Sequence, residues 1–182
     1  MKRYIALLRG INISGKNKIA MSELKASFVE MGYTAVSTYL NSGNVIFLSN
    51  IDDRDILSST IRSMIKCKFE LDIPVFILSQ KELDDILNNA PDWWGDDNKE
   101  IYDNLIFMFP FLSYDEFYNK VGNPKEEYEK VHNYKNVIFW SFSRKDYQKT
   151  NWWSKTASSD IGNSITIRTA NTMRKVLEIC NK

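Results

Sequence analysis

Residues 35–48, AVSTYLNSGNVIFL, contain two apolar, strand-like runs on either side of the turn Asn41-Ser42-Gly43-Asn44. A glycine such as Gly43 readily takes the positive φ that a tight hairpin needs, and asparagine tolerates it. The stretch therefore predicts a β-hairpin with strands over residues 35–40 and 45–48.

The segments around this hairpin complete a β-α-β-β-α-β order. The apolar run from Tyr4 to Leu8 predicts a buried central strand, and the helical spacing of apolar residues over 21–31 predicts a helix. After the hairpin, residues 56–69 predict a helix and 75–78 a strand. This is the order of a split-βαβ, ferredoxin-like unit. We expect its first strand to lie beside both hairpin strands, with the loop after that strand and the hairpin turn at opposite or diagonal ends of the sheet.

The rest of the chain predicts the same order a second time. Ser79 is placed to cap a connecting helix, and a last helix carries Met173, Val176 and Cys180 on its inner face. Between these helices we predict a strand (104–109), a helix with a capping box at Ser113 and Glu116, paired strands (128–134 and 137–142), a helix (151–162) and a strand (165–168).

We therefore predict an α+β fold, a tandem duplication of ferredoxin-like halves packed into one compact unit. The first half covers residues 1–78. The second half covers residues 79–182, including the connecting helix and the C-terminal helix.

Composition argues against several classes of protein. The formal net charge of +1 is too small for a protein that mainly binds nucleic-acid phosphates. One histidine, His132, cannot assemble a zinc site, and Cys67 and Cys180 are expected to be reduced and buried. We expect no metal and no cofactor. The tryptophan pairs 93–94 and 152–153 are expected to pack between the halves.

The N-terminus has no signal-peptide pattern, and no apolar run reaches the length of a membrane span. We therefore expect a cytoplasmic protein with no membrane partner. Its oligomeric state stays open between a monomer and a weak dimer.

A phosphate-loop-like motif follows the first predicted strand. Residues 10–17, GINISGKN, fit G-x-x-x-x-G-K, but Asn17 stands where a magnesium-binding Ser or Thr is required, and the helix begins too late. A softer hypothesis is an anion site in which Arg9 assists a main-chain nest formed by Gly10, Asn12, Ser14, Gly15 and Lys16. The alternative is a solvated loop with Arg9 paired to a structural carboxylate.

Two further groups of residues are candidates: the hairpin turn is a secondary one, and the late group belongs to the same candidate anion site as the loop. The turn residues Asn41, Ser42, Gly43 and Asn44 are either part of a site or simply good turn formers. The late group, Arg168 with Asn171 and Thr172, is either an anion site at the start of the last helix or a helix cap with a surface ion pair.

The residues just quoted resemble a bacterial family, the domain of unknown function 1697 family. The resemblance rests on residues 4–12 (YIALLRGIN), the Ser42-Gly43-Asn44-Val45 turn, and the late TIR and NT motifs at 166–168 and 171–172. It covers essentially the whole chain. The chain departs from the family at Ser14, where a second glycine is usual, and at Thr169 and Ala170. The resemblance implies two ferredoxin-like halves and no established activity.

These observations lead to one main hypothesis and two alternatives. The main hypothesis is a binding module for a small, phosphate-bearing anion in a cleft between the halves, where Arg9, Lys16 and Arg168 would give a positive field. The first alternative is a phosphate-directed hydrolase or transferase, because some acyl-phosphate hydrolases place an arginine loop after the first strand with a water-orienting asparagine such as Asn41 nearby. The second is a protein-interaction domain. Whether the protein is an enzyme stays open, and no catalytic residue is assigned.

Overall fold

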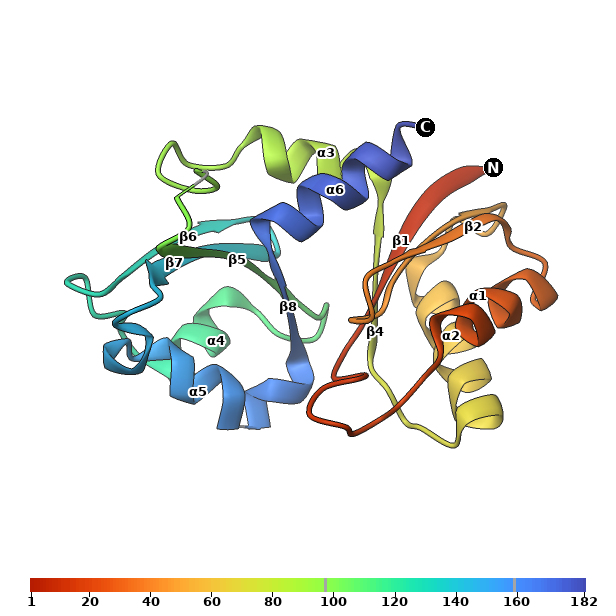
Figure 1. Ribbon diagram of the computed structural model, residues 1–182, viewed down its shortest axis with the longest axis horizontal. Coiled ribbons are helices and arrows are strands. Elements are labelled where there is room, and N and C mark those ends of the chain that lie inside the picture. Colours follow the sequence, from red (N-terminus) through yellow and green to blue (C-terminus); the bar gives the residue numbers. More distant parts are fainter. Residues whose placement is uncertain (97, 159) are drawn as a thin grey trace. The chain divides into compact units, whose positions relative to one another are not determined.

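The computed structural model describes residues 1–96, 98–158 and 160–182 and has an α+β fold with two four-stranded antiparallel sheets. The chain forms two compact units (Figure 1). The first comprises residues 1–84 and 176–182, and the second comprises 85–175. The boundaries fall inside the helices α3 (Gln80–Asn88) and α6 (Ala170–Cys180). The last seven residues group with the first unit, whereas the sequence analysis placed the whole C-terminal helix in the second half.

The first unit follows the predicted order of elements. They are β1 (Lys2–Leu8), α1 (Met21–Glu30), β2 (Thr34–Tyr39), β3 (Asn44–Ser49), α2 (Arg54–Phe69) and β4 (Val75–Ser79). The sheet order is β2-β3-β1-β4. The expectation that β1 lies beside both hairpin strands was therefore wrong: β1 pairs with β3 and β4, and β2 forms the edge. The connection through α2 returns the chain to the free side of β1.

Both faces of β1 are buried, which explains its uninterrupted apolar run. Tyr4, Ala6 and Leu8 face the core under α1 and α2, while the alternate residues Ile5 and Leu7 are also fully covered. A strand covered on both faces gains from apolar residues at every position rather than at alternate ones. A candidate site region lies at each end of this strand.

The second unit contains the elements β5 (Ile101–Met108), α4 (Tyr114–Val121), β6 (Glu129–Tyr134), β7 (Val137–Ser143), η1 (Tyr147–Lys149), α5 (Trp152–Ser158), η2 (Asp160–Ser164) and β8 (Ile165–Thr169). Its sheet order is β6-β7-β5-β8. The capping box of Ser113 and Glu116 is present. The predicted helix over 151–162 was too long, because a tighter 3-10 turn (η2) replaces its end, where Gly162 disfavours the α-helix.

Tryptophan rings pack inside the second unit. Trp140 and Trp152 are buried in its helix-side core, and Trp94 packs edge-on against Phe139 while its ring N–H donates to the Asn104 carbonyl at 2.9 Å. These rings bury large apolar surfaces in the core of the second unit, and the ring N–H of Trp94 has a hydrogen-bond partner.

The two cysteines differ in environment. Cys180 is buried, and burial raises the pKa of its thiol to about 11. Cys67 is exposed on α2, so the expectation of two buried thiols was wrong for this residue. Within the described ranges, none of the helices combines the length and the apolar content that a bilayer crossing requires.

Candidate functional site

The segment between β1 and α1, residues 9–20, folds back on itself as a small hairpin. The Lys16 amide donates to the Ile13 carbonyl at 2.9 Å, and both central residues, Ser14 (φ 49°) and Gly15 (φ 76°), have positive φ. Positive φ at both central positions is the geometry of a type I′ turn. α1 starts only at Met21, so the motif GINISGKN ends in this turn rather than at a helix N-terminus.

Two asparagine side chains close the loop from inside. The Asn12 carboxamide accepts from the Ile19 amide and donates to the Ile19 carbonyl, both at 2.9 Å. The Asn17 side chain donates to the Gly10 carbonyl at 2.9 Å. These amides satisfy main-chain groups that a loop would otherwise leave to water. Asn12 and Asn17 are therefore occupied in holding the loop's shape.

The loop and the hairpin turn lie at the same end of the sheet, so the expectation of opposite or diagonal ends was wrong. β1 and β3 are antiparallel, with Leu7 opposite Asn44, so the end of β1 meets the start of β3. The Asn12 carboxamide donates to the Asn41 carbonyl at 2.9 Å, and the Leu8 amide donates to the Gly43 carbonyl at 2.8 Å. The structure thus brings together the first and second groups of predicted residues.

The hairpin turn is stabilised by its own side chains. Asn44 is fully buried and donates to the Tyr39 carbonyl at 2.8 Å and to the Ser42 hydroxyl at 3.0 Å. A Cβ added to Gly43 would lie 2.6 Å from the Leu8 Cβ, so this position needs glycine for space as well as for its φ of +78°. Asn41 is exposed at the tip of the turn.

Three cations lie in the loop. Arg9 is half-buried, its amide donates to the Pro74 carbonyl at 3.0 Å, and burial lowers the pKa of its guanidinium. Lys16 and Lys18 are exposed, and neither has an ion-pair partner among the described residues. Residues 9–20 and 40–44 contain no Asp or Glu. We call these two segments together the cationic end of the first unit.

A cavity of about 390 Å³ opens at the cationic end. Its lining combines one cation, two asparagines and an apolar wall, namely Asn12, Gly15, Lys18, Ile19, Ala20, Met21 and Asn41. The Asn12 carboxamide is already bonded to Ile19 and to the Asn41 carbonyl. The Lys18 ammonium and the Asn41 side chain are therefore the polar groups that a ligand would meet.

The third predicted group lies in the second unit. Arg168 is buried, and its guanidinium donates to the Thr166 hydroxyl at 3.0 Å and to the Ile167 carbonyl at 2.8 Å. Thr169, rather than Asn171 or Thr172, caps α6, because its hydroxyl accepts from the Thr172 amide at 3.3 Å. The two predicted arginines belong to different units, so their convergence on one pocket stays a prediction.

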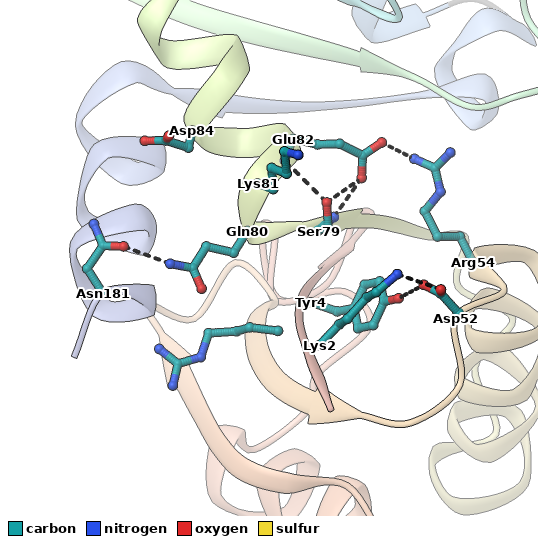
Figure 2. A pocket seen from close by; sticks show the side chains of 11 residues that line it. Lys2, Tyr4, Asp52, Arg54, Ser79, Gln80, Lys81, Glu82, Asp84 and Asn181 are labelled. Atoms are coloured by element: carbon teal, nitrogen blue, oxygen red, sulfur yellow. Dashed lines mark hydrogen bonds and ion pairs between the residues drawn. The ribbon is translucent and has the colours of Figure 1, made fainter.

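A larger cavity, about 650 Å³, lies at the other end of the first unit's sheet (Figure 2). We call it the Tyr4 cavity. Its walls are the start of β1, the start of α2, the first turn of α3 and the end of α6, which contribute Lys2, Arg3, Tyr4, Asp52, Arg54, Ser79, Gln80, Lys81, Glu82, Asp84 and Asn181. Four of these side chains are cations and three are carboxylates.

Most polar groups of the Tyr4 cavity are bonded to one another. Asp52 accepts from the Lys2 ammonium at 2.5 Å and from the Tyr4 hydroxyl at 2.8 Å. Burial, followed by the bond to Asp52, raises the pKa of Tyr4 to about 12. Gln80 donates to the Asn181 side chain at 2.7 Å on the facing wall (Figure 2). The phenol is thus a neutral hydrogen-bonding group at all ordinary pH values.

A second pair crosses the cavity wall. Arg54 forms an ion pair with Glu82, whose other oxygen accepts from the Ser79 amide at 2.9 Å and from the Ser79 hydroxyl at 2.8 Å. The sequence analysis identified Ser79 as a cap but did not identify the cavity. Its residues are distant in sequence and form no motif; the pairing of β1 with β3 and with β4, together with the end of α6, brings them together.

The described residues contain no group of three or more His, Cys, Asp and Glu side chains arranged to hold a metal ion. The two ends of the first unit offer hydrogen-bonding groups and charged side chains.

Comparison with known proteins identifies relatives. A solved structure, that of the conserved bacterial protein SP0830 from Streptococcus pneumoniae, superposes with a TM-score of 0.84 at 31% sequence identity, over 98% of this chain and 98% of that chain. None of the curated proteins compared with the sequence matches it. The family model described as "Protein of unknown function (DUF1697)" matches residues 1–139. The resemblance seen in the sequence is thereby confirmed, and the chain belongs to the DUF1697 family.

Proposed function

We propose that this protein is a binding module for a small anionic ligand, which binds at the cationic end of the first unit. The observation that carries the proposal is the charge of that end: three cations, two of them exposed without an ion-pair partner in the described chain, and no Asp or Glu in either segment. Exposed cations such as Lys16 and Lys18 that have no carboxylate nearby in the chain raise the local concentration of anions.

Arg9 adds to this preference. Its guanidinium loses hydration through burial, which is why its pKa falls. The bidentate geometry of guanidinium also suits phosphate and carboxylate groups.

The experiment is a titration of the protein with inorganic phosphate and with acetyl phosphate, followed by backbone amide NMR. We expect saturable shifts confined to residues 9–20 and 40–44. Replacing Lys16 and Lys18 together by Ala should weaken binding by about tenfold, since each exposed ion pair contributes modestly.

The matched control removes the same charge elsewhere. Lys120 and Lys130 are exposed lysines of the second unit without an ion-pair partner in the described chain, and their joint replacement by Ala should change affinity by less than about twofold. Equal losses in the two double variants, or no saturable shift, would contradict the proposal.

A second candidate function is acyl-phosphate hydrolysis at the same end. Asn41 is exposed and lines the cavity beside the loop of residues 9–20. A carboxamide at this place can orient a water molecule for attack on phosphorus. Hydrolysis of acetyl phosphate would then release acetate and phosphate. Loss of this activity in Asn41→Ala but not in Asn133→Ala, an exposed asparagine of β6, would support the enzyme over the binding module.

We propose further that the two units are ferredoxin-like repeats that arose by duplication. Their matching element orders and matching sheet orders, β2-β3-β1-β4 and β6-β7-β5-β8, support this. Each unit has its first strand in the interior of the sheet, between the second hairpin strand and the last strand.

A further inference from the structure

We infer that the Tyr4 cavity is a second ligand site, specific for an organic anion that carries several oxygen acceptors, of the size of a sugar phosphate or a nucleoside monophosphate. The site is separate from the cationic end, since it lies at the opposite end of the same strands. Three features carry the inference: the unused hydrogen-bonding capacity of the walls, the volume, and the residues at the equivalent place in the second unit.

The unused capacity of the cavity is mainly that of donors. Lys81 has no ion-pair partner in the described chain, Lys2 uses one N–H bond on Asp52, and Arg54 is bonded through one nitrogen to Glu82. An ammonium has three N–H groups and a guanidinium five. The walls formed by β1, α2 and α3 therefore each contribute a positively charged side chain with donors left over.

A larger share of the acceptor sites is occupied: of about four lone-pair sites on each carboxylate, Asp52 uses two and Glu82 uses three. Both oxygens of Asp52 accept bonds, and both oxygens of Glu82 do the same. Asp84 points away from the centre of the cavity (Figure 2). A ligand rich in donors would find few partners, whereas one rich in oxygen acceptors would find several. Phosphate and hydroxyl oxygens have this character.

The volume selects the size of the ligand. At about 650 Å³ the cavity falls in the middle of the range of small-molecule sites. Gln80 and Asn181 lie across from Lys2 and Arg54 (Figure 2), so a ligand must reach both walls to use them all. Inorganic phosphate is too small to do so, whereas a phosphate joined to a sugar is large enough.

The equivalent place in the second unit has different chemistry. In the first unit Tyr4 of β1 pairs with Ser79, the last residue of β4. In the second unit Asn104 of β5 pairs with Thr169, the last residue of β8. By this register, Arg3 corresponds to Asp103 and Lys81 corresponds to Asn171. A smaller cavity, about 360 Å³, lies there. The fold thus forms a hollow at both places, and only the one in the first unit has an excess of cations at these positions.

The test uses a substitution expected to improve binding. Glu82→Gln preserves the capping box with Ser79, because glutamine fulfils the same role as glutamate there. It also removes the carboxylate that competes for Arg54. We expect this variant to bind ribose 5-phosphate about fivefold more tightly than the native protein in calorimetric titrations, and Arg54→Gln to bind it about fivefold more weakly.

Arg62→Gln is the matched control. Arg62 lies on the same helix, is 52% exposed as Arg54 is, and also pairs with a carboxylate, that of Asp72, but does not line the cavity. It should bind ribose 5-phosphate as the native protein does. Inorganic phosphate should bind at least about tenfold more weakly than ribose 5-phosphate at this site.

Three outcomes would overturn the inference: no saturable binding of ribose 5-phosphate or adenosine 5′-monophosphate at millimolar concentrations, equal losses in Arg54→Gln and Arg62→Gln, or no gain in Glu82→Gln. The Lys16 and Lys18 double variant separates the two proposals. It should bind phosphate about tenfold more weakly at the cationic end and keep ribose 5-phosphate binding at the Tyr4 cavity.

Discussion

The two units connect their first strand to their first helix through loops that differ in length and charge. In the first unit the connection is residues 9–20, with three cations and a type I′ turn closed by Asn12 and Asn17. In the second unit it is residues 109–113, FPFLS, which are uncharged and expose Phe111 to 71%. One arrangement of strands therefore accepts a long polar loop or a short apolar one, and the polar one carries the proposed anion site.

The helix that follows each hairpin also starts differently. The α2 helix is capped by the residue before it, Asp53, whose carboxylate accepts from the Asp55 and Ile56 amides at 2.8 and 3.1 Å. The start of α5 is held in part by Glu129 from β6, which accepts from the Asn151 amide at 2.7 Å. The second unit thus adds a distant buried carboxylate to a local cap, in which the Thr150 hydroxyl accepts from the Trp153 amide at 3.3 Å, whereas the first unit uses a local exposed carboxylate.

Glu129→Ala should have the largest effect on stability. Glu129 is 3% exposed and accepts bonds from the Trp140 ring N–H and from the main-chain amides of Lys125, Asn151 and Trp152. Its removal leaves these donors buried and unpaired, at a cost of about 3 kcal/mol in the free energy of unfolding. The measurement is urea unfolding followed by tryptophan fluorescence, which reports the second unit because all five tryptophans lie there.

Asp53→Ala is the counterpart in the first unit. Loss of one exposed helix cap typically costs about 1 kcal/mol, so this variant should be clearly more stable than Glu129→Ala when both are measured by circular dichroism. A similar loss in the two variants would show that the two helix starts do not differ in the way described.

Gly43→Ala should have the next largest effect. The new Cβ would meet the Leu8 Cβ at 2.6 Å and the Ile11 Cδ1 at 2.9 Å, at a φ unfavourable for alanine, so we expect a loss of about 2–3 kcal/mol. Gly15→Ala is the control. Gly15 has a similar φ of +76° but no atom near the added Cβ, so its loss should be about 1 kcal/mol. Equal losses would show that the hairpin does not press against the end of β1.

Elements defined by neighbouring residues could be predicted from the sequence. The turn at 41–44 and the caps at Ser79 and Ser113 depend on residues within a few positions, and the structure contains them. Contacts between distant residues could not be predicted in this way. Tyr4 meets Asp52 across 48 positions, and Glu129 meets Asn151 across 22. These contacts depend on sheet order, which periodicity does not report.

The same reason explains the error about the hairpin turn. Turn chemistry identified Asn41 and Gly43, but their contact with the loop after β1 depends on the pairing of β1 with β3. Arg9 and Lys16 were found from their place after a strand, whereas Lys18, which lines the cavity, stands outside the motif and was not singled out.

Alkaline pH should reduce the stability of the first unit through Tyr4. Its pKa is about 12 in the folded protein and about 10 in an unfolded chain, so folding keeps the phenol protonated. The resulting stabilisation is complete below pH 10 and is lost as the pH rises toward 12. Asn104 occupies the equivalent place in the second unit and has no proton to lose. Urea unfolding by circular dichroism at about pH 9 and 11 should therefore show a larger loss in the native protein than in Tyr4→Phe. Identical losses would contradict the assignment.

Phe111→Ser and Ile13→Ser should have the smallest effects on stability, and they test whether the two connections differ in function. Phe111 is 71% exposed and stacks on Phe109, with 5.8 Å between the ring centroids. Ile13 is 60% exposed at the tip of the loop of residues 9–20. Each substitution should change the free energy of unfolding by no more than about 0.5 kcal/mol, because little apolar area is buried at either place. Only Ile13→Ser changes the surface next to Lys16, so only this variant should alter the amide shifts that phosphate induces at residues 9–20. An equal response in Phe111→Ser would mean that anion binding does not depend on the connection that distinguishes the first unit from the second.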